Sequence, residues 1–141
     1  MAIDRDAFFW QVQDGKLPLP RVASTLGMVI TKVQAEDGRL DAEFEGKPEF
    51  ANPLGNVQGG ILAAMLDDTM GPALACQLRA GEFAPTLNLN VSFLKPAKIG
   101  KLRGVGRVVR RGKDVCVLSG ELYQNDELVA TATATALIRR M

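Results

Sequence analysis

The chain contains no histidine. This absence excludes catalysis by Ser-His-Asp or Cys-His groups, zinc sites built on imidazole, and any histidine general base. Cysteine is scarce as well: Cys76 and Cys116 lie far apart and match no metal-ligand spacing, so we expect no metal site. Acid–base chemistry is left to the carboxylates, the lysines, Tyr123 and the two thiols.

The sequence also lacks an excess of charge of either sign. Its 17 lysines and arginines nearly balance its 16 aspartates and glutamates, so the broad basic field that drives nonspecific nucleic-acid binding is absent. No basic start is followed by an apolar leader, and the apolar run at residues 57–66 is too short and too rich in glycine to span a bilayer. We therefore expect a reduced, soluble, cytoplasmic protein with no nucleic-acid or membrane partner.

With 141 residues, 47% of them hydrophobic, the chain is long enough for one domain with a real core. Residues 1–20 are predicted to form an N-terminal helix, at residues 4–14, and a connector. The connector is Leu17-Pro18-Leu19-Pro20, which cannot continue a helix because proline lacks an N–H group. Residues 28–33 and 39–44 alternate between apolar and polar side chains around Glu36-Asp37-Gly38, and this pattern predicts a β-hairpin.

The second half of the chain predicts one buried helix followed by four strands. Apolar residues occur on every side between Gly60 and Cys76, and Pro72 is expected to kink this helix or to end its first straight section near Gly71. Strands are predicted at residues 86–93, 101–109, 115–123 and 130–136. In the last of them alanine alternates with threonine, and the alanine face would let a helix approach closely. The expected fold class is α+β, with an antiparallel sheet wrapped around one long central helix.

Residues 52–76 combine the features of a site. Gly59 and Gly60 open the helix, where backbone N–H groups and the positive end of the helix dipole can approach a ligand oxygen. Close packing at the start of the helix is the alternative explanation of the two glycines. Asp67 and Asp68 lie within the apolar helix, where a carboxylate is costly unless it is used or paired. Because they point ~100° apart, only one can face a site, and we expect the other to be solvated or paired at the surface.

Two motifs of this chain resemble those of hot-dog-fold acyl-CoA thioesterases of the PaaI-like branch. The first is Asn52-x-x-Gly55-x-x-Gln58-Gly59-Gly60, with Asp67 nine positions after Gln58, and the second is the run from Thr86 to Gly100. The resemblance covers roughly residues 20–139 and implies a hot-dog fold, hydrolysis of an acyl-CoA with no cofactor beyond the coenzyme A of the substrate, and dimers with sites at the interface. The sequence departs from the family at Gln58, where the family usually has histidine.

The resemblance also implies roles for individual residues. Asp67 corresponds to the carboxylate that acts as general base or nucleophile, and the Gly59 N–H to the donor that polarises the thioester carbonyl. Thr86 corresponds to the hydroxyl residue that helps to position water, although threonine is also an ordinary strand residue. Asn52 corresponds to the polar residue ahead of the glycines, although asparagine before proline is also an ordinary turn residue. Gln58 cannot act as a base, and our hypothesis is that its amide orients the loop or the carbonyl.

A local basic cluster is the expected site for the coenzyme A portion. The cluster consists of Arg110-Arg111-Gly112-Lys113 together with Lys95 and Lys98. An ordinary solvated turn is the alternative explanation of this charge run. The resemblance implies instead that this turn and the segment 93–95 hold the nucleotide and its phosphates, which suit Arg and Lys. The predicted substrate-binding residues are Gly60, Phe93, Lys95, Arg110, Arg111, Gly112 and Lys113.

Helix geometry predicts that one chain cannot complete the site. Gly59 and Asp67 are eight helical residues apart, which is ~12 Å at 1.5 Å per residue, and an aspartate side chain cannot close that distance. If both act on one carbonyl, the donor of one chain must meet the carboxylate of another across a two-fold interface. We therefore expect a homodimer, with pairing of dimers into a tetramer as a further expectation.

Two functions remain open at this point. The favoured one is hydrolysis of an acyl-CoA thioester, and the alternative is a hot-dog protein that binds acyl-CoA or an acyl carrier without turning it over, because Gln58 replaces histidine. A hot-dog dehydratase is disfavoured because the related families use histidine for that chemistry. Short-chain, medium-chain and aromatic acyl groups all remain possible substrates.

Overall fold

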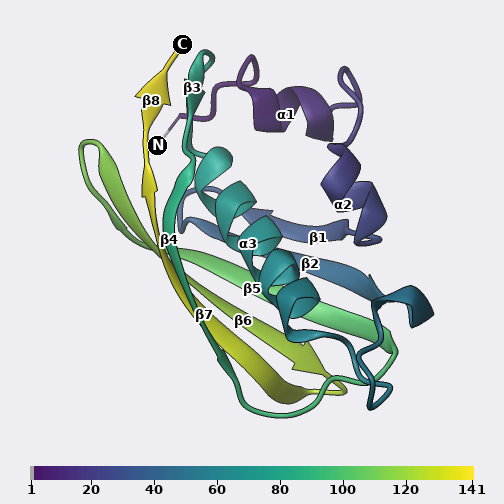
Figure 1. The fold of residues 1–141 in the computed structure, drawn as a ribbon. Coiled ribbons are helices and arrows are strands. Elements are labelled where there is room, and N and C mark those ends of the chain that lie inside the picture. Colours follow the sequence, from purple (N-terminus) through teal and green to yellow (C-terminus); the bar gives the residue numbers. More distant parts are fainter. Residues whose placement is uncertain (1) are drawn as a thin grey trace.

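The predicted arrangement of a sheet around a helix is confirmed by the computed structural model, which describes residues 2–141 (Figure 1). The hairpin consists of β1 (Val29–Gln34) and β2 (Arg39–Gly46). The later strands are β4 (Thr86–Phe93), β5 (Gly100–Arg111), β6 (Val115–Gln124) and β7 (Glu127–Leu137). These strands pair antiparallel in the order β1-β2-β5-β6-β7-β4 and curve around α3 (Gly59–Ala75).

Two of the three predicted turns are confirmed as predicted, whereas Arg110 and Arg111 of the third are the last two residues of β5. Gly38, which ends the hairpin turn between β1 and β2, has a φ of 61°. Asn125 and Asp126 connect β6 to β7 with φ values of 52° and 64°. Asparagine and aspartate tolerate this left-handed conformation better than other residues with a side chain, and two successive residues with positive φ match the twist of a hairpin.

Pro72 does not end the central helix, because α3 continues through it to Ala75. Pro72 cannot donate to the carbonyl of Asp68, but its own carbonyl accepts the N–H of Cys76 at 3.0 Å, so the last turn stays closed. Packing on several sides outweighs the lost hydrogen bond, because Met65, Leu66 and Met70 are fully buried between the helix and the sheet.

Glycines in the sheet let α3 lie unusually close to it. A Cβ atom added at Gly106 would lie 2.5 Å from the backbone oxygen of Thr69, and one added at Gly104 would lie 2.6 Å from the Thr69 hydroxyl. A Cβ at Gly120 would lie 3.0 Å from the Met70 side chain. The alanines of β7 are buried as expected, but the close approach that the sequence suggested for them is made over the glycines of β5 and β6.

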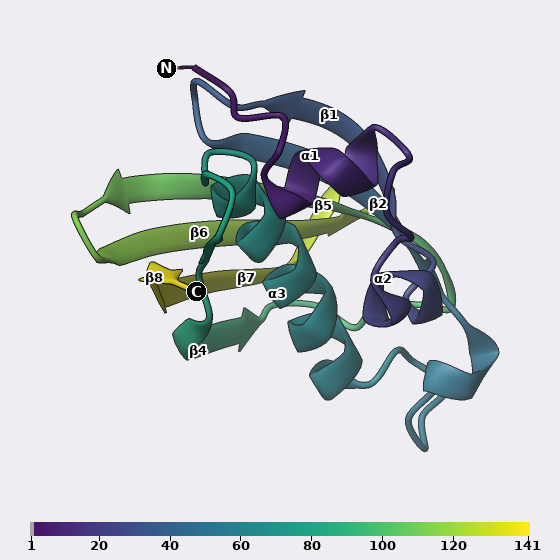
Figure 2. The same cartoon turned by 90° about the horizontal axis from the view of Figure 1, so that it is seen from above.

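Two short helices precede the sheet, of which only one was predicted. α1 (Phe8–Gln13) is shorter than the predicted residues 4–14, and α2 (Arg21–Thr25) begins directly after Pro20, at the end of the predicted connector. The indole N–H of Trp10 donates to the carbonyl oxygen of Cys76 at 2.9 Å and ties α1 to the end of α3. In two views, both helices lie on the β1 side of α3 and leave its β4 side uncovered (Figures 1 and 2).

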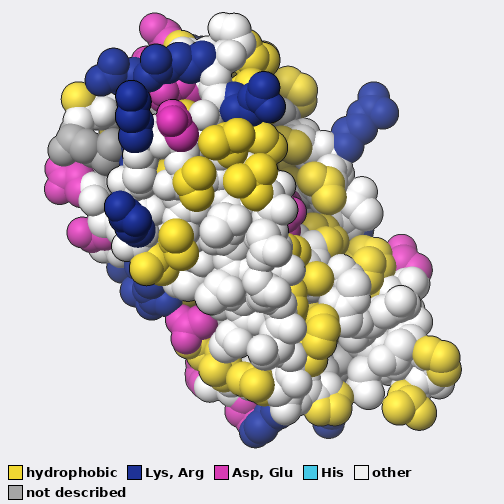
Figure 3. Space-filling model, turned by 60° about the vertical axis from the view of Figure 1, so that its left-hand side comes forward, with side chains coloured by type: hydrophobic (Ala, Val, Ile, Leu, Met, Phe, Trp, Pro, Cys, Tyr) yellow, Lys and Arg dark blue, Asp and Glu magenta, His cyan; other side chains and the backbone are white. Residues whose placement is uncertain are grey.

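β4 is an edge strand, and its apolar face is less buried than the alternation predicted. Leu87 and Phe93 are 56% and 55% exposed, whereas the pattern suggested one buried and one polar face. The reason is that β4 lies at the edge of the sheet, and no helix or strand of residues 2–141 covers its outer edge. The face that carries β4 shows hydrophobic and uncharged side chains across its middle and most of its charges at its margins (Figure 3). A small second sheet above it, β3 (Glu82–Phe83) with β8 (Arg139–Arg140), was not predicted.

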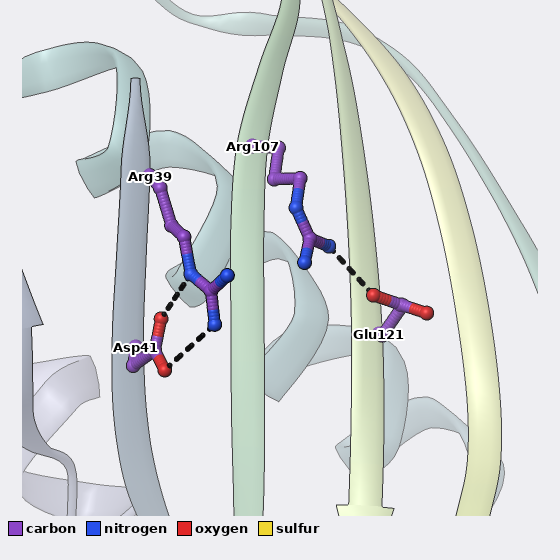
Figure 4. A network of polar contacts seen from close by, with 4 residues as sticks. All are labelled: Arg39, Asp41, Arg107 and Glu121. Atoms are coloured by element: carbon purple, nitrogen blue, oxygen red, sulfur yellow. Dashed lines mark hydrogen bonds and ion pairs between the residues drawn. The ribbon is translucent and has the colours of Figure 1, made fainter. Parts of the chain in front are cut away.

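The outer face of the sheet, away from α3, carries a charged cluster whose members satisfy one another (Figure 4). Arg39 donates to both carboxylate oxygens of Asp41, at 2.9 and 3.2 Å, and Arg107 donates to Glu121 at 2.6 Å. The hydrogen bond from Arg107 holds the pKa of Glu121 below its usual value. Beneath these side chains Val105 is only 2% exposed. The cluster therefore accounts for its own charges and is not a candidate catalytic centre.

Within residues 2–141, no helix combines the length and the apolar composition needed to cross a membrane. The same residues contain no group of three or more His, Cys, Asp or Glu side chains placed to hold a metal ion.

Candidate active site

The start of α3 presents two backbone amides. Gln58 is the N-cap, and its carbonyl accepts the N–H groups of Ile61 and Leu62 at 2.9 and 3.2 Å. Gly59 and Gly60 occupy the first two helical positions, where an N–H has no acceptor within the helix. A methyl group at Gly59 would lie 3.1 Å from the Phe93 ring, whereas Gly60 has open space in front of it. The pair therefore serves both explanations: Gly59 allows close packing on Phe93, and both amides remain free for a ligand.

Asn52 organises the loop ahead of this helix. Its side-chain oxygen accepts the backbone N–H groups of Leu54 at 3.0 Å and Asn56 at 3.1 Å. This is the behaviour of an asparagine in a turn. The Gln58 backbone N–H bonds to the carbonyl of Phe50 at 2.9 Å, in the short 3-10 helix Pro48–Phe50. The Gln58 side chain is exposed and makes no capping hydrogen bond, so it is available to a ligand.

Four of the predicted residues line one groove of about 350 Å³ beside the start of α3. They are Asn52, Gly59, Phe93 and Lys95. Lys95 is also paired with Glu127 at 2.5 Å, and both side chains are more than half exposed. An exposed pair of this kind is weak, so Lys95 can exchange Glu127 for a phosphate.

The predicted carboxylate lies next to the predicted hydroxyl. Thr86, the first residue of β4, donates its hydroxyl to Oδ1 of Asp67 at 3.0 Å. The bond fixes one carboxylate oxygen and leaves the other free to act on water or on a carbonyl carbon. The bond joins two residues that are 19 positions apart in the sequence.

Asp68 departs from the expectation of a solvated or paired side chain, because one of its two carboxylate oxygens is buried. Its Oδ2 atom is buried, and among residues 2–141 it has no hydrogen-bond partner. Burial raises the pKa of Asp68 to about 6, and the charge of Asp67 adds to the rise. The physical reason is that α1 and α2 lie over this side of α3, and the sequence did not reveal that coverage.

The two cysteine thiols are buried and are therefore poor candidates for a nucleophile. Cys76 and Cys116 are 1% and 0% exposed. Burial raises the pKa of the Cys76 thiol to about 11, so little thiolate forms near neutral pH.

The basic turn lies at the other end of the molecule from the Gly59 groove. Arg111 donates to the carbonyl of Gln77 at 3.0 Å, beyond the end of α3. Sheet register places Arg111 in one row with Cys116, Ala136 and Thr86. Phe93 is seven strand residues from Thr86, about 23 Å at 3.3 Å per residue. One chain therefore does not bring the turn Arg110-Arg111-Gly112-Lys113 together with Phe93 and Lys95.

The predicted residues thus divide into two groups along α3. The first group, at the helix start, contains Asn52, Gln58, Gly59, Gly60, Phe93 and Lys95. The second group, from the middle of α3 to its end, contains Asp67, Thr86, Arg110, Arg111, Gly112 and Lys113. Because α3 is continuous from Gly59 to Ala75, the separation of ~12 Å expected between Gly59 and Asp67 applies.

The structure combines a backbone N–H donor at a helix start, a carboxylate held by a hydroxyl and a sheet that curves around one helix. A chain with these features also matches a known family. The model of the thioesterase superfamily matches residues 54–131, which include Gly59, Asp67 and Thr86. The chain belongs to the thioesterase superfamily. Acyl-coenzyme A thioesterase 13 of Homo sapiens is 30% identical to this chain over 94 residues. The matched region covers 66% of this chain and 66% of the human protein.

Solved structures agree with this assignment. The phenylacetic acid degradation-related protein of Ralstonia eutropha JMP134 is 48% identical, with a TM-score of 0.91 over 92% of this chain and 98% of that chain. The PaaI protein of E. coli, from the phenylacetic acid degradation operon, has a TM-score of 0.82 over 99% of this chain and 96% of that chain. The E. coli protein is only 22% identical to this chain. This likeness therefore concerns the fold alone, which is the hot-dog fold.

Sequence reasoning missed the apolar walls next to the candidate site. Phe8 of α1 and Phe83 of β3 line a groove beside the second half of α3. Both belong to short elements that leave little periodic signal in the sequence. The available signal was the unusual presence of two phenylalanines and a tryptophan, Phe8-Phe9-Trp10, in an otherwise polar N-terminal segment.

Proposed function

We propose that this protein hydrolyses an acyl-CoA thioester to a free acid and coenzyme A, as a homodimer whose sites each combine the two groups of residues. The observation that supports this most is the division itself. The donor at Gly59 and the carboxylate at Asp67 each have local support, from Phe93 and from Thr86, yet they lie on one straight helix too far apart to share a substrate.

The chemistry follows from the two groups. The Gly59 N–H, assisted by the helix dipole, stabilises the charge that develops on the carbonyl oxygen. Asp67 either removes a proton from the attacking water or attacks the carbonyl carbon itself, and water then hydrolyses the resulting anhydride. In both routes the C–S bond breaks and coenzyme A leaves as its thiol. Thr86 holds the Asp67 carboxylate in place through its hydroxyl.

Edge strand β4 supplies a way to assemble the two groups. If β4 pairs antiparallel with β4 of a second copy, about a centre between Leu89 and Asn90, Thr86 lies opposite Phe93 of the second copy. Because Gly59 packs beside Phe93 and Asp67 binds Thr86, the same two-fold axis brings donor and carboxylate together. The exposed Leu87 and Phe93 would be buried by this pairing.

The coenzyme A portion is proposed to lie along the groove beside Gly59. Lys95 borders that groove directly. In the same dimer, the Arg111 turn of the second copy lies about ten helical residues past its Asp67, about 15 Å from the reacting carbonyl. This position suits the nucleotide end of an extended ligand, where Arg and Lys contact phosphate.

Mixing two inactive variants tests this proposal. Gly59→Pro removes the amide hydrogen, and proline is well accepted at the first helical position. Gly59→Ala is its control, because its Cβ also crowds Phe93 but it keeps the N–H. Asp67→Asn removes the carboxylate. We expect Gly59→Pro and Asp67→Asn each to lose at least about 100-fold in kcat, and Gly59→Ala to lose much less.

Coexpression of Gly59→Pro with Asp67→Asn decides whether sites are shared. Random assembly makes half of the dimers mixed, and each mixed dimer has one intact site of two, so activity should return to about a quarter of the wild-type value. No recovery in dimers shown to be mixed would place both groups in the same chain and refute the shared site. Unchanged turnover in Asp67→Asn alone would refute the role of Asp67.

The alternative, acyl-CoA binding without turnover, rests on the exposed Gln58 in place of the family histidine. Release of free thiol from a panel of acyl-CoAs separates the two functions. Binding of the acyl-CoAs with no thiol released by the wild-type protein would favour the alternative.

A further inference from the structure

An apolar groove begins next to the proposed reacting group. It has a volume of about 470 Å³ and lies between α1, the second half of α3 and β3. Its walls include Phe8, Gly71, Pro72, Ala75, Phe83 and Ala84. Gly71 is one helical turn after Asp67, on the same side of α3, and Ala84 precedes Thr86 by two residues. An acyl group bound with its carbonyl at Asp67 can therefore continue into this groove.

A smaller chamber of about 100 Å³ adjoins the groove. The two cavities share Phe8, Phe9, Pro72 and Ala75 as walls. At roughly 30 Å³ for each water-sized group, the chamber has room for about three such groups. It can hold the tip of an acyl group but not its body.

Among residues 2–141, Asp68 is the one ionisable residue that lines this chamber. The other walls are apolar except for Gln13, and they come from α1, α2, β1 and α3. Asp68 itself lines the chamber, and its Oδ2 atom is buried with no hydrogen-bond partner among residues 2–141. A buried oxygen of this kind is costly unless water or a ligand donates to it.

The position of the oxygen limits what can satisfy it. Asp67 and Asp68 are adjacent on α3 but point ~100° apart, so the chamber lies around the helix from the proposed reacting carbonyl. A ligand that reaches it must be mostly apolar, to fit the phenylalanine walls, and must end in a hydrogen-bond donor.

We propose that the chamber is the distal end of the acyl site and that Asp68 accepts a hydrogen bond from a hydroxyl or amino group at the far end of the acyl chain. Asp68 is then a residue that determines specificity, distinct from Asp67, which acts on the thioester. This inference rests on the proposed thioesterase function and names the acyl class: apolar chains that carry a terminal donor.

Matched substrate pairs test the inference. Each pair consists of an acyl-CoA and its terminally hydroxylated analogue, in a series from butanoyl to octanoyl, with 6-aminohexanoyl-CoA to distinguish an amine from a hydroxyl. For the chain length that reaches the chamber, we expect the wild type to favour the hydroxylated or amino substrate by at least about tenfold in kcat/KM. Asp68→Leu should bring this ratio to about one or below.

Two further variants keep the test decisive. Asp6→Leu makes the same exchange at an exposed position, and it should retain the wild-type ratio. Ala23→Val adds two methyl groups at a buried residue of the chamber wall, and it should abolish the preference while leaving Asp68 in place. Circular dichroism and thermal melting establish that each variant is folded.

The outcomes separate the two proposals. Hydrolysis of every pair at equal kcat/KM overturns the Asp68 subsite and leaves the thioesterase function standing. A preference that survives in folded Asp68→Leu assigns the selectivity to another residue and also overturns the inference. Binding without thiol release from any substrate overturns the proposed function, and the subsite inference with it.

Discussion

Asp68 makes a testable contribution to stability that depends on pH. Burial raises its pKa from an ordinary value of 3.8 to about 6, with a smaller rise from Asp67. A carboxyl whose pKa is raised by folding binds its proton more tightly in the native state. Below pH 3.8 both states are protonated and folding carries no cost. The cost grows as pH rises from 3.8 and is complete above pH 6.

The size of this cost follows from the shift. A difference of about 2 pKa units corresponds to about 3 kcal/mol, and this is a ceiling because part of the side chain remains exposed and is screened by solvent. We therefore expect about 1–2 kcal/mol. Asp68→Asn cannot ionise, so its free energy of unfolding should gain this amount relative to wild type between pH 4 and pH 8.

Urea denaturation at pH 4, 5, 6, 7 and 8 measures the difference, at one fixed protein concentration because the proposed dimer would make stability depend on concentration. The quantity of interest is how the difference in free energy of unfolding between wild type and Asp68→Asn changes with pH. The absolute size of that difference also includes the cost of the unpaired amide of the new asparagine. Glu36→Asn, at an exposed position, is the control. A difference between wild type and Asp68→Asn that stays constant from pH 4 to pH 8 would show that Asp68 titrates normally and refute the reasoning.

Three other predictions concern single contacts. Thr86→Val should lower kcat about tenfold with little change in KM, because it removes the hydroxyl that holds Asp67, and Thr86→Ser should retain most activity in the same thiol-release assay. Gly106→Ala should lower the free energy of unfolding by about 2–3 kcal/mol, because the added methyl lies against the Thr69 backbone; an unchanged denaturation midpoint would contradict this. Coenzyme A affinity, measured by calorimetry, should fall steeply with salt if the Arg111 turn and Lys95 contact its phosphates, and salt-independent affinity would contradict their role.

The strands and the long helix were predictable because their patterns are long and their environments uniform. The alternation at residues 86–93 and 130–136 predicted β4 and β7, and a run that is apolar on every side predicted α3. The short elements were not predictable. α2 has five residues and β3 and β8 have two each, so their formation depends on what they pack against rather than on their own periodicity.

The candidate site was predicted residue by residue but not as an arrangement. The motif identified Gly59 and Asp67, and helix geometry alone placed them too far apart. The position of the Arg111 turn could not be predicted in the same way. It depends on the register of four strands, in which Arg111 shares a row with Thr86 and not with Phe93.

The environments of Asp67 and Asp68 show why a local motif underdetermines a site. The two side chains are identical and adjacent, and a rotation of ~100° about α3 separates them. One faces the uncovered edge beside β4 and finds the Thr86 hydroxyl. The other faces α1 and α2 and finds only apolar walls and Gln13. β4 of the main sheet supplies the first environment, whereas two short N-terminal helices create the second. Specificity can therefore change in those helices without any change in Asp67, Thr86 or Gly59.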